Sequence, residues 1–284
     1  TLRMGVLLEL DAPSVQHRLK VIIDSKNLVL ENVYNQEPHS YDEIMEWCRS
    51  QAEFFKDYIC DVGTLLGAAA GQGKNILFEA QLGALRDIDY GIYPFTSSSN
   101  TIASYAPIGA GIPGCALDNV VGVMKAYSTC VGEGPFVAET AMGEAWNEKL
   151  RESGGEFGAA TGRPRRVGPF DAVASRYGIR CQKAQDIALT KLDVLGAFDK
   201  IPVITGYRLH GVLLDSFPTD SRLEEAEPVI EELPGWGCDI SGCRSWRDLP
   251  ENARKYVCTL EKLVDHPIYL VSTGAERDAY LLRE

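Results

Sequence analysis

A short polar run that follows an apolar segment has the side chains suited to recognising a base. Thr190-Lys191-Leu192-Asp193 comes directly after Ile187 to Leu189, a pattern that predicts a buried strand ending in a polar turn. The Asp193 carboxylate can accept both the ring N–H and the exocyclic amine of guanine, while the Lys191 stem can lie across the base. A surface ion pair with a helix cap is the alternative, and the placement after a strand favours guanine.

A second polar run ends another predicted strand. Ser272-Thr273-Gly274 follows Ile268 to Val271, and glycine permits a close approach of the backbone to a ligand. Because it stands at the end of a strand, this run could supply a close backbone approach to the same base as Asp193.

An arginine-rich segment is the candidate for binding anions. Thr161-Gly162-Arg163-Pro164-Arg165-Arg166 places three guanidinium groups within four residues. Arginine grips carboxylate and phosphate groups through paired N–H donors. The whole chain has 28 basic against 40 acidic side chains and a net charge of −12, which disfavours a nucleic-acid patch, and a solvated loop without a partner is the other alternative. A small anionic ligand is the better hypothesis.

Other chemical signals in the sequence have simpler explanations. Gly71-Gln72-Gly73-Lys74 lacks the flanking residues of a phosphate-binding loop, and the glycine pattern from Gly109 to Gly114 contains Pro113, which removes a backbone donor. The acidic group Glu79, Asp87 and Asp89 is expected to serve in capping and ion pairing. The eight cysteines form no Cys-x-x-Cys and the four histidines are isolated, so we expect free thiols, a reducing cytoplasm and no metal site.

The elements that must position these residues begin with a helical region over residues 1–70. The apolar residues Val15, Leu19, Ile22 and Ile23 recur at helical spacing behind Asp11 and Pro13. Ser40 and Glu43 form a capping box for a second helix, whose apolar residues are Ile44, Trp47, Phe54, Phe55, Tyr58 and Ile59.

The rest of the chain alternates strands, glycine-rich loops and helices. Asn75 to Phe78 is predicted to be a buried strand, and 203–209 with 212–214 a hairpin. Asp248 is expected to cap a final helix with an apolar stripe, and the long loop 96–114 is expected to be functional. This pattern predicts an α/β fold with a mainly parallel central sheet flanked by helices, in a single domain over 1–284. The absence of an 18-residue apolar run predicts no membrane span.

Taken in order, these segments resemble the adenylosuccinate synthetase family. The matching runs extend over nearly the whole chain and are Ile76 to Glu79, Asp87 to Phe95 with Ser98 to Asn100, Lys125 to Thr129 with Val131-Gly132 and Gly134 to Phe136, Glu156 to Ala159 with Thr161 to Arg166, Leu189 to Leu195, Leu233 to Trp236, and Val271 to Gly274. Each run alone is weakly specific, whereas their combination in this order is highly specific.

The resemblance implies a P-loop-GTPase-like ligase fold and a homodimeric cytoplasmic enzyme of purine biosynthesis. Such an enzyme joins IMP and L-aspartate at the expense of GTP, with Mg2+ as cofactor and with no nucleic-acid or membrane partner. The implied site residues are, for GTP, Lys191, Asp193, Ser272, Gly274 and Arg165; for aspartate, Thr161, Gly162, Arg163 and Arg165; and for IMP, Ser97, Val131, Arg163 and the position of Leu82.

The chain also departs from the family pattern. Leu82 stands where the family has an IMP-contacting Gln, Ser97 replaces Thr, Ala160 replaces Thr, and Cys130 stands where Arg is common. The family's Gly-Asp-Glu-Gly-Lys-Gly-Lys loop, which supplies the catalytic Asp and a magnesium ligand, and the catalytic His are not found, so we expect them upstream of Thr1. We therefore expect the central and C-terminal part of a longer enzyme, without its phosphate-loop segment and inactive alone. The alternative is a non-catalytic guanine-nucleotide-binding or interaction domain.

Overall fold

The computed structural model describes residues 2–283 and divides into two compact units. One unit runs to Ile76 and includes Ala110–Ile112, and the other consists of Leu77–Gly109 and the chain from Pro113 onward. The expectation of a single domain with a helical subregion over 1–70 stays a prediction. No helix among the described residues is both long and apolar enough to span a membrane.

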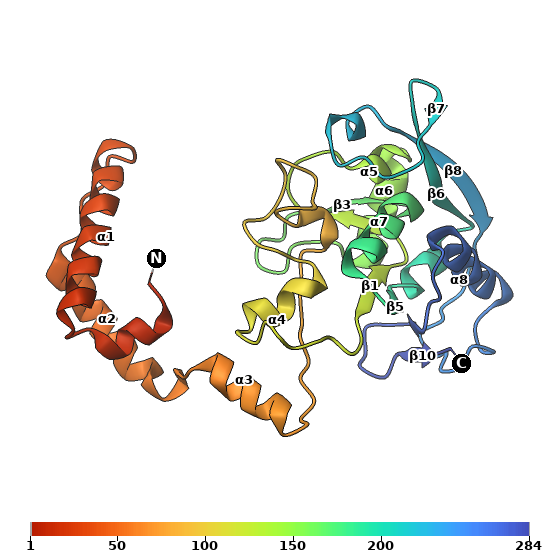
Figure 1. Ribbon diagram of the computed structural model, residues 1–284. Coiled ribbons are helices and arrows are strands. Elements are labelled where there is room, and N and C mark those ends of the chain that lie inside the picture. The colour runs from red at the N-terminus through yellow and green to blue at the C-terminus, as the bar shows by residue number, and fades with distance from the viewer. Residues whose placement is uncertain (1, 284) are drawn as a thin grey trace. The chain divides into compact units, whose positions relative to one another are not determined.

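The first unit is built from helices (Figure 1). They are η1 (Met4–Glu9), α1 (Pro13–Asn32), α2 (Tyr41–Phe55), η2 (Lys56–Tyr58) and α3 (Val62–Gly71). Val15, Leu19 and Ile23 of the predicted stripe of α1 are buried, whereas Ile22 is only partly buried. Pro13 lies in the first turn, where a missing N–H costs nothing. Asp11 forms an ion pair with Arg49 at 2.7 Å instead of capping α1.

Helix α2 begins as its sequence predicts but buries a different face. The Ser40 hydroxyl accepts a hydrogen bond from the backbone N–H of Glu43 at 3.1 Å, which caps the helix. The buried residues of α2 are Met45 and Cys48, while Trp47 is 60% exposed and Phe54 is 69% exposed. The expected aromatic core face is therefore wrong, because the smaller side chains pack against η1 and α1 in this unit's core.

The second unit contains all the strands of the described residues. Its elements in chain order are η3 (Ala84–Arg86), η4 (Ala103–Tyr105), α4 (Ala106–Gly109), β1 (Val121–Lys125), β2 (Ser128–Cys130), α5 (Val137–Thr140), α6 (Glu144–Gly154), β3 (Arg166–Gly168), β4 (Phe170–Asp171), α7 (Ala172–Gln182), β5 (Asp186–Thr190), η5 (Asp193–Ala197), β6 (Lys200–Leu209), β7 (Val212–Leu213), η6 (Ser221–Leu223), β8 (Glu227–Pro234), α8 (Glu251–Val264), β9 (Leu270–Ser272) and β10 (Tyr280–Leu282).

The principal sheet has the strand order β1-β5-β9-β10. β1, β5 and β9 are parallel, and β10 is antiparallel to β9. A second sheet pairs β6 in parallel with β4 and antiparallel with β7 and β8, so the predicted hairpin of 203–209 and 212–214 is confirmed. In Figure 1, β6 and β8 form a long curved pair with β7 at one end. The α/β class with parallel strands flanked by helices is confirmed.

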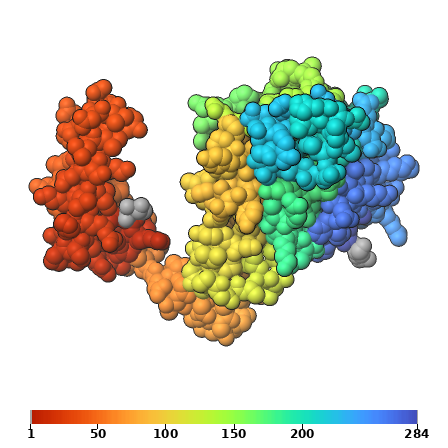
Figure 2. Space-filling view, turned by 45° about the horizontal axis from the view of Figure 1, so that its top comes forward, coloured from red at the N-terminus to blue at the C-terminus, as the bar shows by residue number. Residues whose placement is uncertain are grey.

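The core of this unit lies between the principal sheet and helix α8. Ile187 and Leu189 of β5 are fully buried, as expected for a central strand of a parallel sheet. They belong to the same cluster as the predicted stripe of α8, whose members are Ala253, Tyr256, Val257, Leu260 and Val264. The segment 77–109 packs on helix α7 (Figure 2). The Tyr177 hydroxyl of this helix donates to the Tyr90 carbonyl oxygen.

Two expectations about local structure are wrong. Asn75 to Phe78 forms no strand, and Leu77 is 94% exposed. A strand needs a hydrogen-bonding neighbour, and none of the described strands pairs with this segment. Asp248 accepts the backbone N–H groups of Arg244 and Ser245, while Pro250 occupies the cap position of α8. An apolar run in the sequence thus does not show which strand it would pair with. A carboxylate near a helix start likewise does not show which backbone N–H groups it will bind.

Candidate functional site

The polar runs predicted to bind a ligand lie at one edge of the principal sheet. Lys125, the last residue of β1, pairs with Thr190, the last residue of β5. Leu189 pairs with Val271 of β9, so residues 191–193 and 272–274 leave the sheet side by side. The carboxyl ends of parallel strands are the usual ligand-binding edge of an α/β sheet.

Asp193 presents an unused acceptor at this edge. Its Oδ1 atom is buried and has no hydrogen-bond partner among the described residues. Burial raises the pKa of the Asp193 carboxyl, and the nearby Lys191 ammonium opposes that rise. A buried carboxylate oxygen without a donor is costly, and an N–H group of a ligand would satisfy it.

Lys191 and the 272–274 turn flank this carboxylate. Lys191 has a left-handed backbone with φ of 64°, and its Nζ donates to the Gly154 carbonyl oxygen at 2.9 Å. The Ser272 hydroxyl donates to the Gly274 carbonyl oxygen at 2.9 Å. A Cβ atom on Gly274 would lie 3.1 Å from that of Ala279, so this position favours glycine.

A buried carboxylate, Glu156, connects three side chains next to this edge. Its Oε1 accepts from the Lys125 Nζ at 2.8 Å and from the Tyr127 hydroxyl at 2.6 Å, while its Oε2 accepts from the Arg165 guanidinium at 2.7 Å. Glu156 follows Gly155, whose φ of 61° ends helix α6. A side chain on Gly154 would collide with the Tyr127 hydroxyl at 2.5 Å.

The ionisation of the Glu156 group follows from these contacts. Burial alone would raise the pKa of Glu156, but hydrogen bonds from Lys125, Tyr127 and Arg165 outweigh it and hold the pKa below its ordinary value. Burial lowers the pKa of Lys125 and raises that of Tyr127. The carboxylate therefore stays ionised at neutral pH and holds Arg165 in place.

The three arginines of the anion-binding candidate have different surroundings. Arg165 is bound to Glu156, and Arg166 forms an ion pair with Glu139 at 2.6 Å. Arg163 is exposed, on a turn in which the Gly162 N–H donates to the Gly158 carbonyl oxygen at 2.8 Å. Arg163 thus presents its guanidinium to solvent, whereas Arg165 and Arg166 also support the fold.

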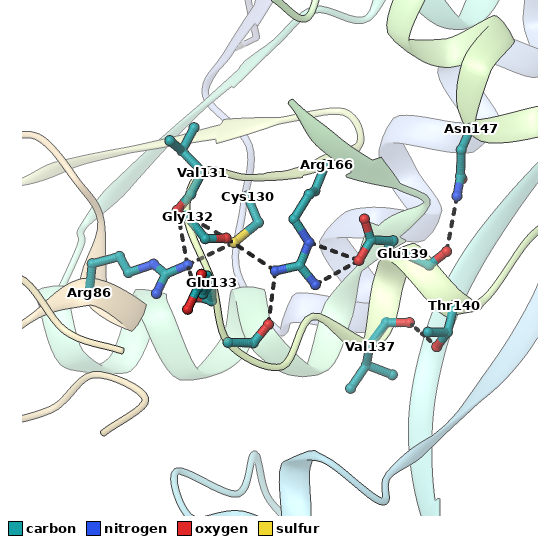
Figure 3. Close-up of polar contacts among 11 residues, drawn as sticks. Arg86, Cys130, Val131, Gly132, Glu133, Val137, Glu139, Thr140, Asn147 and Arg166 are labelled. Carbon is teal, nitrogen blue, oxygen red and sulfur yellow. Dashed lines mark hydrogen bonds and ion pairs between the residues drawn. The ribbon is translucent and has the colours of Figure 1, made fainter. Parts of the chain in front are cut away.

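Of the segments expected to bind IMP, those that contain Ser97 and Val131 are connected through Arg86. The N–H of Ser97 donates to the Arg86 carbonyl oxygen at 2.8 Å, and the Arg86 guanidinium donates to the Val131 carbonyl oxygen at 3.0 Å (Figure 3). Leu82 is 56% exposed with φ of 72°. No spacing in the sequence indicates the contacts of Arg86 or Glu156. Most of their partners lie 29 to 47 residues away, and Phe95 and Arg165 lie nine residues away.

The acidic cluster proves structural where it is buried. Asp87 accepts the backbone N–H groups of Asp89, Tyr90 and Thr101 and so fixes the turn that follows η3. No helix begins at this turn, and none of the three acidic residues forms an ion pair with another described residue, so the expectation of capping and ion pairing is wrong in detail. All eight cysteines are free thiols. Among the described residues, no group of three or more His, Cys, Asp or Glu side chains is arranged to hold a metal ion.

The fold and this edge define a class of protein. Buried acceptors and cationic side chains at the carboxyl ends of parallel strands are typical of nucleotide-binding α/β proteins. The family model for adenylosuccinate synthetase matches residues 1–281, and the chain belongs to that family.

Individual relatives agree with this assignment. The chain is 46% identical over 274 residues to the adenylosuccinate synthetase of Trichlorobacter lovleyi and 43% identical over 274 residues to that of Geobacter sulfurreducens; each match covers 96% of this chain and 63% of the relative. A solved structure of the fully ligated adenylosuccinate synthetase from Plasmodium falciparum superposes with a TM-score of 0.90 at 32% identity, covering 100% of this chain and 66% of that one. The chain thus spans less than two thirds of these relatives.

Proposed function

We propose that the polypeptide carrying this chain joins IMP and L-aspartate to form adenylosuccinate, with conversion of GTP to GDP and phosphate. The observation that carries the proposal is the buried, unpartnered Asp193 Oδ1 beside Lys191, in a chain that belongs to this family. A carboxylate acceptor matches the two donors on the Watson–Crick edge of guanine and repels the acceptor of adenine at the same place.

The reaction has two steps. In the first, N1 of the IMP purine loses its proton while the 6-oxygen takes the terminal phosphoryl group of GTP, which releases GDP. In the second, the aspartate amine attacks C6 of the purine, phosphate leaves with the 6-oxygen, and the nitrogen loses a proton. Phosphorylation turns a poor oxygen leaving group into a good one, and positioned cationic groups stabilise the charge on the transferring phosphoryl.

We assign the residues of this chain to binding. Lys191, Asp193, Ser272 and Gly274 hold the guanine base. Thr161, Gly162 and Arg163 grip the aspartate carboxylates, with Arg165 reaching both aspartate and GTP, and Arg163 also contacting IMP. Ser97, Val131 and the position of Leu82 contact IMP. The exposed guanidinium of Arg163 and the fixed one of Arg165 support these assignments, because one can adapt to a ligand while the other is already oriented.

The remaining parts of the proposal concern groups beyond these residues. Mg2+ is the proposed cofactor, with its ligands outside the described residues. The catalytic Asp and His are likewise assigned to a segment that this chain does not contain, so the isolated chain is proposed to be inactive. The active form is proposed to be a cytoplasmic homodimer.

Replacing Asp193 with Asn tests the guanine assignment. One accepting oxygen becomes a donor, and loss of a charged hydrogen bond of about 1.5–3 kcal/mol should raise the KM for GTP by about 10- to 100-fold. Discrimination between GTP and ATP should fall as well. The measurement is the purine absorbance change with IMP, aspartate and either nucleotide, using the complete polypeptide.

Asp199→Asn, an exposed carboxylate near the end of η5, is the matched control and should leave both KM values unchanged. An unchanged nucleotide preference in the Asp193 variant would reject the guanine assignment alone. A complete wild-type polypeptide without any GTP-dependent change in absorbance would reject the ligase.

The second candidate is a non-catalytic guanine-nucleotide-binding or interaction domain. It is favoured by the exposed apolar Leu82 at an expected IMP contact and by Ala160, which lacks the hydroxyl of the Thr that the family has there. This candidate predicts guanine-nucleotide binding without ligation, and turnover by the complete polypeptide would reject it.

A further inference from the structure

Arg86, the last residue of η3, contacts two segments that are far apart in the sequence. Its Nη1 donates to the Phe95 carbonyl oxygen at 2.5 Å, and its Nη2 donates to the carbonyl oxygens of Val131 and Glu133, each at 3.0 Å (Figure 3). Its backbone carbonyl oxygen accepts the N–H of Ser97 at 2.8 Å. One residue therefore holds the 95–97 turn and the 131–134 loop against each other.

The 131–134 loop is fixed from its other side by Arg166. The Arg166 Nη1 donates to the carbonyl oxygens of Gly132 at 3.2 Å and Gly134 at 2.8 Å, while its other nitrogens bind Glu139. Four successive carbonyls thus alternate between two guanidinium groups, which reach the loop from opposite sides in Figure 3. The loop is a defined conformation rather than a free connection.

Packing adds to these hydrogen bonds. Gly134 has φ of 107°, and a Cβ atom on it would lie 2.6 Å from Cγ of the Phe95 ring. The loop backbone therefore rests directly on the segment that leads to Ser97. Phe95 is thus contacted twice, by the loop glycine and by the Arg86 guanidinium.

We propose that Arg86 is a positioning residue for IMP, which fixes the spacing between Ser97 and Val131. The inference rests on the proposed function, because it takes both residues as IMP contacts. Val131 is 72% exposed on a loop with two left-handed glycines, so without Arg86 the ligand would have to order the loop itself. Ordering a loop on binding weakens affinity, and a preformed one avoids that loss.

The planar fork of arginine is what this position needs. Two nitrogens of Arg86 donate hydrogen bonds to three carbonyl oxygens, and its Nη2 also lies 2.9 Å from the Cys130 sulfur. A lysine ammonium has all its N–H donors on one nitrogen at the end of a shorter side chain. It can therefore bind only some of these carbonyl oxygens. A lysine variant should therefore behave between wild type and a leucine variant.

The test uses Arg86→Leu and Arg86→Lys in the complete polypeptide, with steady-state kinetics in each substrate. We expect Arg86→Leu to raise the KM for IMP by about tenfold or more, with kcat and the KM values for GTP and aspartate within about threefold of wild type. Arg86→Lys should recover part of the IMP affinity. A purely structural defect would instead lower kcat and weaken all three substrates together.

Arg222→Leu is the matched control, because Arg222 is exposed and its side chain binds only the neighbouring Asp220 among the described residues. It should leave all KM values unchanged. If the wild type turns over and the Arg86 variants show the same KM for IMP as this control, the inference is overturned while the proposed function stands. If Arg86→Leu does not fold, Arg86→Lys carries the comparison, and an unchanged IMP KM there overturns it equally. An inactive wild type rejects the proposed function itself.

Discussion

Burying a carboxylate costs several kcal/mol unless its oxygens are hydrogen-bonded, and Glu156 offsets that cost with three donors. The arrangement leaves the carboxylate 1% exposed while Lys125 is 28% and Arg165 is 33% exposed. The two cations therefore keep one side toward solvent or a ligand. Glu156 consequently determines where the Arg165 guanidinium points.

Replacing Glu156 with Gln should destabilise the protein. Removing one partner of a buried ion pair typically costs about 3–5 kcal/mol, and we expect about 2–3 kcal/mol because Lys125 and Arg165 keep partial solvation. Chemical denaturation at pH 7 measures the effect. Glu152→Gln, an exposed residue of α6, is the control, and an equal midpoint for both variants would contradict the assigned role.

The stability difference between the wild type and the Glu156→Gln variant should depend on pH. The pKa of Glu156 is lowered in the folded state from an ordinary value of 4.5, so its stabilisation is fully present above that value. It is lost as the pH falls through the folded pKa. The difference in unfolding free energy between wild type and Glu156→Gln should therefore be constant from pH 7 to about 5 and shrink at lower pH. A difference that grows on acidification would show the opposite shift.

Secondary elements could be predicted where local pattern and tertiary environment agree. The β5 strand and the α8 stripe were found because a short apolar run and a helical period each specify burial without reference to a particular partner. Asn75 to Phe78 was mistaken for a strand because the same kind of run does not specify a neighbour. Trp47 and Phe54 are exposed, which shows that a small helical unit can leave its largest apolar side chains outside its core.

The candidate site, like the secondary structure, could be predicted only where a local pattern in the sequence indicates it. The runs that contain Asp193 and Ser272 are each predicted from the sequence to follow a strand, and the structure shows that β5 and β9 are neighbouring parallel strands. The contacts of Glu156 and Arg86 were not predicted, because a side-chain hydrogen bond across dozens of residues has no local period. Each of these hydrogen bonds ends on one atom of the partner residue. The sequence contains many other carboxylates and arginines, and nothing in it distinguishes Glu156 and Arg86 from them.

Helix α8 supplies a direct test of the core. Leu260 is fully buried among the residues of β5 and β9, and replacing it with Ala should cost about 2–5 kcal/mol through lost burial and an unfilled cavity. Lys262→Ala, on the exposed side of the same helix, should change stability by less than about 0.5 kcal/mol. Thermal unfolding of both variants measures the contrast, and similar midpoints would mean that α8 is not part of the principal core.

For the molecule as a whole, charge is distributed unevenly. The chain has a net charge of −12, and its densest arginine segment is partly neutralised from within by Glu156 and Glu139. Only Arg163 of the three arginines is exposed. Such a surface can attract a small anion at one place while repelling extended polyanions.

The chain should therefore not bind nucleic acid. Phosphate-backbone binding strengthens as salt falls, so we expect no retention of DNA or RNA even at about 50 mM salt. Filter binding or an electrophoretic shift checks this, with a basic protein of similar size as the positive control. Salt-sensitive retention that disappears in an Arg163→Ala variant would contradict the prediction and identify the arginine segment as a nucleic-acid contact.

The alternating carbonyls of the 131–134 loop have a consequence for how that loop can recognise anything. In each peptide plane the N–H points opposite to the C=O, so carbonyls committed in turn to Arg86 and Arg166 direct successive amides to opposite faces. A phosphate cradle requires several neighbouring amides to converge on one point. If Val131 contacts IMP as proposed, this loop contributes separate amides and an apolar side chain, and other residues must bind the negative charge of the ligand.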